Sequence, residues 1–231
     1  MDFFDAVKAR RSIRKFKDEP IPEAVMEQAF EAAVLAPNSS NMQTWDFFWV
    51  RSPEKKAGLV EACMKQSAAR TAAELVVVTA DPALWERANP EMISFVDRVN
   101  APEPVKDYYR SYIPASYRFG LASPLGFAKR LAATVAGLRR PVPRTPHTLR
   151  DLQEVAIKSA ALACENFVLA LSAQGYATCM MEGFDEDRVK ALVGVDGSSR
   201  VVMVIAAGRE GARGTWGPQF RIATGKVVHR V

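Results

Sequence analysis

The spacing of hydrophobic residues along the chain predicts two prominent helices. Residues 22–35 begin with Pro22 and carry apolar side chains three and four positions apart, the spacing of one helix face. Residues 149–173 form the longest such stretch, and their many alanines leave small surfaces on several sides. Because a helix that is apolar on several sides is normally buried, we expect this helix in the core or at a subunit interface.

Shorter apolar runs predict strands. Residues 46–50 are strand-like, residues 75–79 form a buried strand, and residues 200–207 are the most β-branched run, which is typical of a central strand. Two further helices are predicted, one over residues 52–69 and one capped by Asp185 that continues through residue 192. Strands separated by helices are compatible with a doubly wound parallel sheet.

Composition limits the classes of function. A chain of 231 residues with 48% hydrophobic content can bury a substantial core as one domain, residues 1–231. The net charge of +5 is spread along the chain without a nucleic-acid-binding motif, so no nucleic-acid partner is indicated. We found no apolar run long enough to span a bilayer and no signal region, so we expect no membrane partner and a cytoplasmic location.

The residues that usually mark metal or nucleophile chemistry are sparse. Cys63, Cys164 and Cys179 lie far apart in sequence and are most simply reduced thiols, as in a cytosolic protein. His147 and His229 lack Cys or carboxylate neighbours at ligand spacing, so no metal site is predicted. The sequence contains no nucleophile elbow, P-loop or dinucleotide fingerprint. We therefore expect the chemistry to belong to a bound cofactor.

Two segments carry candidate binding chemistry. Residues 36–45 place six polar side chains in a short loop after Pro37, and in an extended chain Asn41 and Gln43 point the same way. Residues 10–16 read Arg-Arg-Ser-Ile-Arg-Lys-Phe, and guanidinium groups bind phosphate oxygens through paired hydrogen bonds. Taken singly, the loop is compatible with a solvated turn and the basic run with a solvated helix end.

Together these segments resemble the nitroreductase family, whose members begin with a helix, a basic Arg-Arg-Ser turn, a second helix and a Pro-Ser-Ser-x-Asn-x-Gln-Pro-Trp loop. Residues 175–184 are similar to the family's strand and turn against the flavin ring. Gly208-Arg209, residues 214–221 and residues 227–229 are similar to its C-terminal phosphate-binding arm. Asn38, Thr44 and Gln219 depart from the usual Ser, Pro and basic residue.

The resemblance implies an α+β fold, a nitroreductase-like three-layer sandwich in which a mixed β-sheet is flanked by helices. It also implies an intertwined homodimer with active sites at the subunit interface. The last six residues are hydrophobic and short enough to add as a strand to a partner's sheet edge.

The resemblance further implies a site for flavin mononucleotide (FMN). Arg10 and Ser12 would lie near the phosphate and Arg14 nearer the ring, Arg221 would close the phosphate site, and Gln66 would reach the ribityl or pyrimidine edge. Pro37 would pack on the flavin and the other loop residues would come from the partner subunit. The full set of implied cofactor-binding residues is Arg10, Arg11, Ser12, Arg14, Pro37, Asn38, Ser39, Asn41, Gln66, Met181, Glu182, Gly183 and Arg221.

The implied activity is reduction of a small-molecule acceptor, such as a nitroaromatic, quinone or enone, by NADPH or NADH through a ping-pong hydride mechanism. The backbone N–H of Glu182 would address the flavin N5, with a general-acid role for its carboxylate as the alternative. Since the flavin carries the chemistry, no catalytic side chain is needed. Two alternatives stay open: another flavin chemistry on this fold, such as dehalogenation or flavin fragmentation, and a non-enzymatic flavin-binding protein.

Residues 82–148 are the least regular part of the sequence and exceed the length found in smaller family members. This insertion can form a substrate lid or a dimer arm, because Tyr and Trp suit both. A membrane-surface or calmodulin-like role for residues 131–140 has little support. The aromatic residues are Trp85, Tyr108, Tyr109, Tyr112, Tyr117 and Phe119, and the basic residues are Arg139, Arg140, Arg144 and Arg150.

Overall fold

A four-stranded antiparallel sheet forms the centre of the protein. The computed structural model describes residues 1–118, 131, 133–142, 145–146 and 148–231, so Phe119, Arg144 and His147 lie outside the described residues. The strands are β1 (Trp45–Val50), β2 (Glu74–Ala80), β3 (Ala177–Met181) and β4 (Arg200–Gly208), in the order β1-β2-β4-β3. Strand β4 is central, which confirms the prediction from its β-branched residues.

Every pairing between these strands is antiparallel, which corrects the expected mixed sheet. The chain leaves β1 and enters β2 at the same end of the sheet, where Val50 pairs with Leu75. A parallel arrangement would need the connection to cross to the opposite end. Within the described residues, parallel pairing occurs at the isolated bridge between Ser12 and Thr178.

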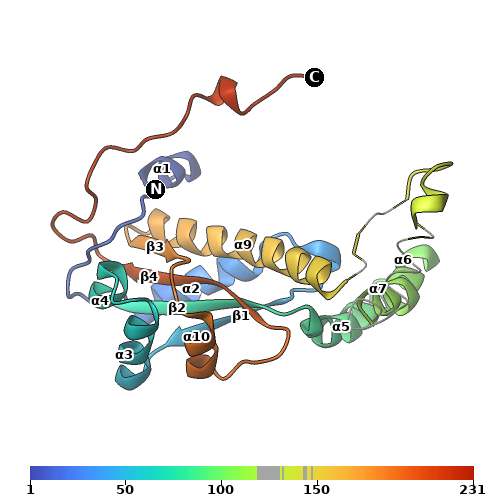
Figure 1. The fold of residues 1–231 in the computed structure, drawn as a ribbon, viewed down its shortest axis with the longest axis horizontal. Helices are drawn as coiled ribbons and strands as arrows, with labels where there is room; N and C mark the ends of the chain where they lie inside the picture. Colours follow the sequence, from blue (N-terminus) through green and yellow to red (C-terminus); the bar gives the residue numbers. More distant parts are fainter. Residues whose placement is uncertain (119–130, 132, 143–144, 147) are drawn as a thin grey trace.

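Helices cover both faces of the sheet. Helices α2 (Glu23–Val34) and α9 (Leu149–Ala173) pack on one face, and α3 (Pro53–Ala62), α4 (Ser67–Thr71) and α10 (Glu186–Val193) lie on the other (Figure 1). Residues of β2 alternate between the two resulting cores: Val76 and Val78 face α9, while Leu75 and Val77 face α3. The three-layer α+β sandwich is therefore confirmed.

The predicted bounds of α9 are confirmed, and those of α10 (Glu186–Val193) agree to within one residue. Both helices begin with a strong cap. Thr148 and Asp151 form a capping box at the start of α9, and the Asp185 side chain accepts from the backbone N–H of Arg188. Helix α9 is long and apolar enough to cross a membrane by length and composition, so our expectation that no apolar run could do so was wrong. Its packing against the sheet and α2 makes it a core helix in this fold.

The single helix predicted over residues 52–69 is wrong. Helix α3 ends at Ala62, and Met64 and Lys65 adopt left-handed backbone conformations before α4 begins at Ser67. The break is closed by backbone hydrogen bonds, including one from Lys65 N to the carbonyl of Val60 (2.9 Å). No glycine or proline lies at the break, so the sequence gives no local signal for it.

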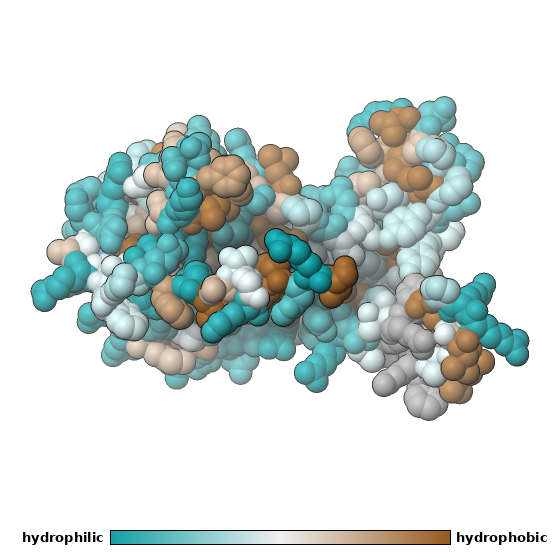
Figure 2. Space-filling model, turned by 90° about the horizontal axis from the view of Figure 1, so that it is seen from above, coloured by the Kyte–Doolittle hydropathy of each residue, from teal (hydrophilic) through white to brown (hydrophobic). Residues whose placement is uncertain are grey.

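The supposedly irregular insertion is mostly helical where it is described. Helices α5 (Trp85–Arg98), α6 (Glu103–Asp107) and α7 (Ile113–Arg118) form an arm that projects from the sandwich, with a π-helical segment at residues 108–112 between α6 and α7 (Figures 1 and 2). We call residues 85–118 the arm. The arm has its own apolar cluster, in which Trp85 stacks on Tyr117 with ring centroids 5.6 Å apart.

The two ends of the chain lie outside the sandwich. Helix α1 (Phe3–Ala9) packs on the end of α9, where Ser172 Oγ donates to the carbonyl of Ala6 (3.2 Å). The apolar side chains of α1 are exposed, as are many apolar residues beyond β4. The exposed apolar residues of these ends include Phe3, Phe4, Val7, Trp216, Phe220, Ile222, Val227 and Val228. These residues offer apolar surface to another molecule.

Candidate functional site

The basic turn at residues 10–16 is fixed beside β3. Ile13 is buried and donates its backbone N–H to the carbonyl of Thr178 (2.9 Å). Phe16 is also buried, and its N–H donates to Thr71 Oγ1 (3.1 Å). These two anchors fix the register of the turn, so that Ser12 and Arg14 line an adjacent cavity.

The segment after β4 packs directly against this turn. Arg14 N donates to the carbonyl of Gly214 (2.8 Å), and Gly211 N donates to the carbonyl of Lys15 (2.9 Å). A Cβ atom at Gly214 would lie 2.8 Å from Cγ2 of Ile13 and 3.1 Å from the Lys15 oxygen. The close approach of the two segments therefore requires glycine at position 214.

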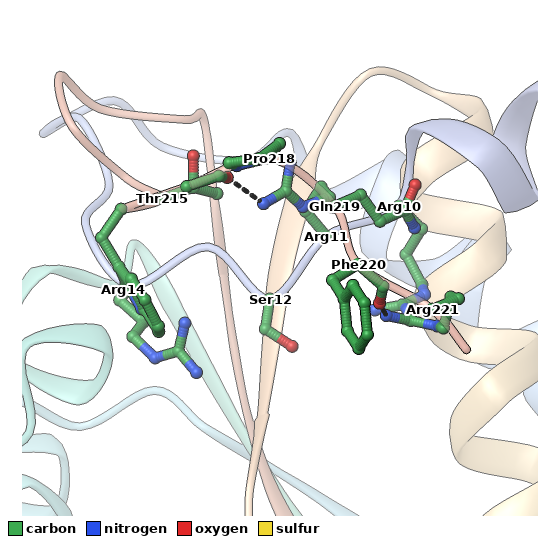
Figure 3. A pocket seen from close by; sticks show the side chains of 11 residues that line it. Arg10, Arg11, Ser12, Arg14, Thr215, Pro218, Gln219, Phe220 and Arg221 are labelled. Atoms are coloured by element: carbon green, nitrogen blue, oxygen red, sulfur yellow. Dashed lines mark hydrogen bonds between the residues drawn. The ribbon is translucent and has the colours of Figure 1, made fainter.

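A cavity of about 250 Å³ lies between the basic turn and the C-terminal segment (Figure 3). Arg11 Nη2 donates to the carbonyl of Gly217 (2.7 Å) and joins the two walls. The Ser12 hydroxyl lies between Arg14 on one side and Arg10 and Arg221 on the other (Figure 3). The lining residues are Arg10, Arg11, Ser12, Arg14, Thr215, Trp216, Gly217, Pro218, Gln219, Phe220 and Arg221.

Every ionisable residue that lines the cavity is an arginine. Glu165 approaches from outside and lies 3.9 Å from Nε of Arg10, while Arg221 Nη1 donates to the carbonyl of its neighbour Phe220 (2.8 Å). A cluster of guanidinium groups with a hydroxyl group suits phosphate. Since whole-ligand pockets usually exceed about 300 Å³, this cavity suits one part of a cofactor.

A second group of predicted site residues lies at the end of β3. Gln66 Nε2 donates to the carbonyl of Gly183 at 2.6 Å, so the α3–α4 break and the β3 turn are joined. Met181 is buried, whereas Glu182 is exposed. Burial raises the pKa of the neighbouring Cys179 thiol, and the Arg14 guanidinium partly opposes this shift. The bridge between Ser12 and Thr178 places the basic turn directly beside β3.

The loop at residues 36–44, which we call the cofactor loop, lies elsewhere. Ser39 N donates to Ser159 Oγ on α9 (3.4 Å), and Pro37 and Asn38 line a separate cavity of about 400 Å³. Helix α1 contacts α9 at Ser172, thirteen residues further on. At 1.5 Å per residue, the two contact points are roughly 20 Å apart along the helix. Arg10 of the basic turn, however, approaches α9 at Glu165, six residues from Ser159 and therefore roughly 9 Å along the helix. The loop and the basic turn line separate cavities.

The backbone of the cofactor loop corrects one expectation. Asn41 and Gln43 do not share a direction in an extended chain, because Ser40, Asn41 and Gln43 all have positive φ. The Asn38 side chain closes the loop, since its Oδ1 accepts from Gln43 N (2.8 Å) and its Nδ2 donates to the carbonyl of Ala36 (3.2 Å). Asn38 thus has a structural role that the sequence motif did not reveal.

Our list of site residues omitted two contributions. Thr215, Trp216 and Phe220 line the arginine cavity. The sequence could have indicated them, because they lie in residues 214–221, the segment that resembles the phosphate-binding arm. Tyr108 and Met92 contact the cofactor loop from the arm, and no local motif marks either residue. No cluster of His, Cys, Asp or Glu that could hold a metal ion occurs among the residues described.

Comparisons with known proteins agree with this geometry. The model of the nitroreductase family matches residues 7–209. Protein DrgA of Synechocystis sp. is 29% identical over 90% of this chain and 84% of its own length. The NADH dehydrogenase of Thermus thermophilus is 25% identical over 99% of this chain and 95% of its own. A candidate nitroreductase of Exiguobacterium sibiricum, solved in complex with FMN, is 25% identical with a TM-score of 0.74, over 100% of this chain and 98% of its own.

Proposed function

Since the chain belongs to the nitroreductase family of oxidoreductases, we propose that it binds FMN and uses NADPH or NADH to reduce a small-molecule acceptor. The observation that carries this proposal is the arginine cavity between residues 10–14 and 215–221. The name of the Thermus relative and the FMN complex of the Exiguobacterium protein support the nicotinamide and the flavin, respectively. The acceptor class is a nitroaromatic, quinone or enone.

The arginine cavity would hold the phosphate of FMN. Arg10 and Arg221 offer charge-assisted hydrogen bonds on one side of the cavity, Arg14 lies on the opposite side, and the Ser12 hydroxyl lies between them (Figure 3). Arg11 holds Gly217 and thereby keeps the second wall in place. Arg10, Ser12 and Arg221 would thus contact the phosphate, whereas Arg11 would position the second wall.

The flavin ring would lie along the end of β3. Gln66 and Gly183 are joined there by the 2.6 Å hydrogen bond, and Glu182 between Met181 and Gly183 is exposed. Met181, Glu182 and Gly183 would line the ring, and Arg14 would stabilise negative charge at its pyrimidine edge. FMN, when bound, supplies the hydride chemistry, so the protein needs no catalytic nucleophile.

A homodimer would complete the site. The cofactor loop and the basic turn line separate cavities within one chain, so we assign Asn38, Ser39 and Asn41 to the flavin of the partner subunit. Pro37 would pack against the flavin from the same side. The exposed apolar residues of α1 and the C-terminal segment supply surface for such an assembly. The three buried, free cysteines fit a cytoplasmic location.

Two-substrate kinetics test the proposed reaction. Initial rates are measured with NADPH or NADH varied at several fixed concentrations of a quinone, and then of a nitroaromatic. If the nicotinamide leaves before the acceptor enters the same pocket, double-reciprocal plots give parallel lines. Intersecting lines would show that both substrates bind together, which would contradict the ping-pong mechanism.

A further inference from the structure

The cofactor loop and the arm form one packed unit. Met42 of the loop is fully buried in the arm's apolar cluster, together with Trp85, Ile113 and Tyr117. The buried Met42 side chain anchors the loop to the arm. It does not determine where the polar side chains next to Met42 point, and other contacts must do so. Those neighbours are the residues that the proposed function assigns to FMN.

The loop needs external support because its backbone is unfavourable. Ser40 (φ 55°), Asn41 (φ 57°) and Gln43 (φ 46°) all carry a Cβ in the left-handed region. Residues other than glycine persist there when surrounding contacts hold them. Within the loop, the Asn38 side chain supplies part of this support through Gln43 N. Asn38 Nδ2 also donates to Asn41 Oδ1 (3.4 Å), and further support comes from outside the loop.

Three hydrogen bonds link the arm to the loop, and one of them runs from Arg87 Nη2 to the carbonyl of Gln43 (3.5 Å). Ser40 Oγ and Tyr108 Oη are 2.6 Å apart and share a hydrogen bond, and Asn41 Nδ2 donates to Met92 Sδ (3.1 Å). The ring of Tyr108 is itself fixed, because it stacks on Tyr112 with centroids 5.2 Å apart and planes 19° apart. Tyr108 also opens the π-helical segment, a feature that is frequent at functional sites.

We infer that Tyr108 is a positioning residue for the cofactor loop. Its hydroxyl group holds Ser40 in the left-handed conformation, and this conformation directs Ser39 and Asn41 toward the FMN of the partner subunit. Tyr108 acts through Ser40 and does not touch the cofactor. The inference rests on the proposed function. It adds that the position of the arm affects flavin affinity, because the hydrogen bond between Tyr108 and Ser40 couples the arm to the loop.

A pair of conservative variants tests the inference. Tyr108→Phe keeps the stacked ring and removes the hydroxyl group, and Ser40→Ala removes the other partner. Each should weaken FMN binding about three- to tenfold, the range for loss of one neutral hydrogen bond. Because both remove the same bond, the double variant should bind FMN no more weakly than either single variant. Tyr112→Phe is the matched control, because it removes a hydroxyl group from the stacked ring and leaves the Ser40 contact intact.

Amide hydrogen exchange of the FMN-free protein gives a readout that needs no cofactor. In Tyr108→Phe, exchange should accelerate at residues 40–43 and stay unchanged in β2 and β4. Additive losses in the double variant, or faster exchange with unchanged FMN affinity, would overturn the positioning role while the proposed function stands. A wild-type protein that binds no FMN would overturn the proposed function and this inference with it.

Discussion

The guanidinium group of Arg11 donates a 2.7 Å hydrogen bond to the carbonyl of Gly217, although 206 residues separate the two. This contact joins the basic turn to the C-terminal segment at the rim of the arginine cavity. One side chain thus couples two sequence motifs that are remote along the chain, and the cavity depends on their remaining together.

Loss of this contact should weaken cofactor binding without removing a phosphate ligand. Arg11→Met keeps most of the aliphatic stem and deletes the donor, so the segment at 215–219 should loosen. We expect FMN affinity to fall about tenfold, since hydrogen bonds of charged groups contribute about 1.5–3 kcal/mol and this one is partly exposed. Titration of the FMN-free protein with FMN measures the effect, and unchanged affinity would contradict the bracing role.

Two glycines of the same segment give a matched pair. In Gly214→Ala the new methyl group meets Ile13 and the Lys15 oxygen, whereas nothing lies within 4 Å of a Cβ at Gly217. Gly214→Ala should therefore destabilise the fold by about 1–3 kcal/mol and weaken FMN binding. Gly217→Ala should leave the stability of the fold unchanged, because the new methyl group meets no other atom of the protein. Thermal unfolding and FMN titration check both, and equal effects in the two variants would refute the close packing.

The shared site can be tested by mixing two defective proteins. Arg10→Ala/Arg221→Ala should lose FMN affinity by at least tenfold and stay dimeric, because charged hydrogen bonds to phosphate are lost. Asn38→Ala/Asn41→Ala should impair the half supplied by the partner. Random subunit exchange in an equimolar mixture makes half of the dimers heterodimers, each with one intact site of two, so about a quarter of the FMN binding should return. Absence of any recovery would place both groups of residues in the same subunit's site.

The buried thiols should lower stability at alkaline pH. Burial raises the pKa of Cys63 from 9.0 to about 11 and that of Cys164 to about 12. Above pH 9 the unfolded chain binds fewer protons than the folded protein, so the free energy of unfolding falls as pH rises. Urea unfolding between pH 8 and pH 10.5 should show a shallower decline in Cys63→Ala/Cys164→Ala. An identical slope in wild type and variant would contradict this assignment.

The fold was predictable where local signals agreed. The bounds of α9 follow from a capping box and a long apolar pattern, and both are properties of neighbouring residues. The break at Met64 and Lys65 was missed because residues with a Cβ adopt the left-handed conformation there. The arm was taken as irregular, yet it is helical, and α5 even contains Pro90 within its helix. Tertiary packing around Trp85 and Tyr117 outweighs the local cost there.

The candidate site was predictable as motifs but not as contacts. Arg10, Ser12, Arg14 and Arg221 meet at one cavity, as the family resemblance implied. The Asn38 side chain instead closes its own loop, and the hydrogen bond between Ser40 and Tyr108 joins residues 68 positions apart. Such a contact depends on how the arm packs, and no spacing in the sequence records it.

Anaerobic reduction of the bound flavin tests the central claim most directly. The purified protein is loaded with FMN, its visible absorption is recorded without oxygen, and NADPH and then NADH are added. The account predicts a yellow protein that bleaches with one of the two nicotinamides and regains its colour when a quinone is added. A protein that stays yellow with both, or that binds no FMN at all, would contradict it.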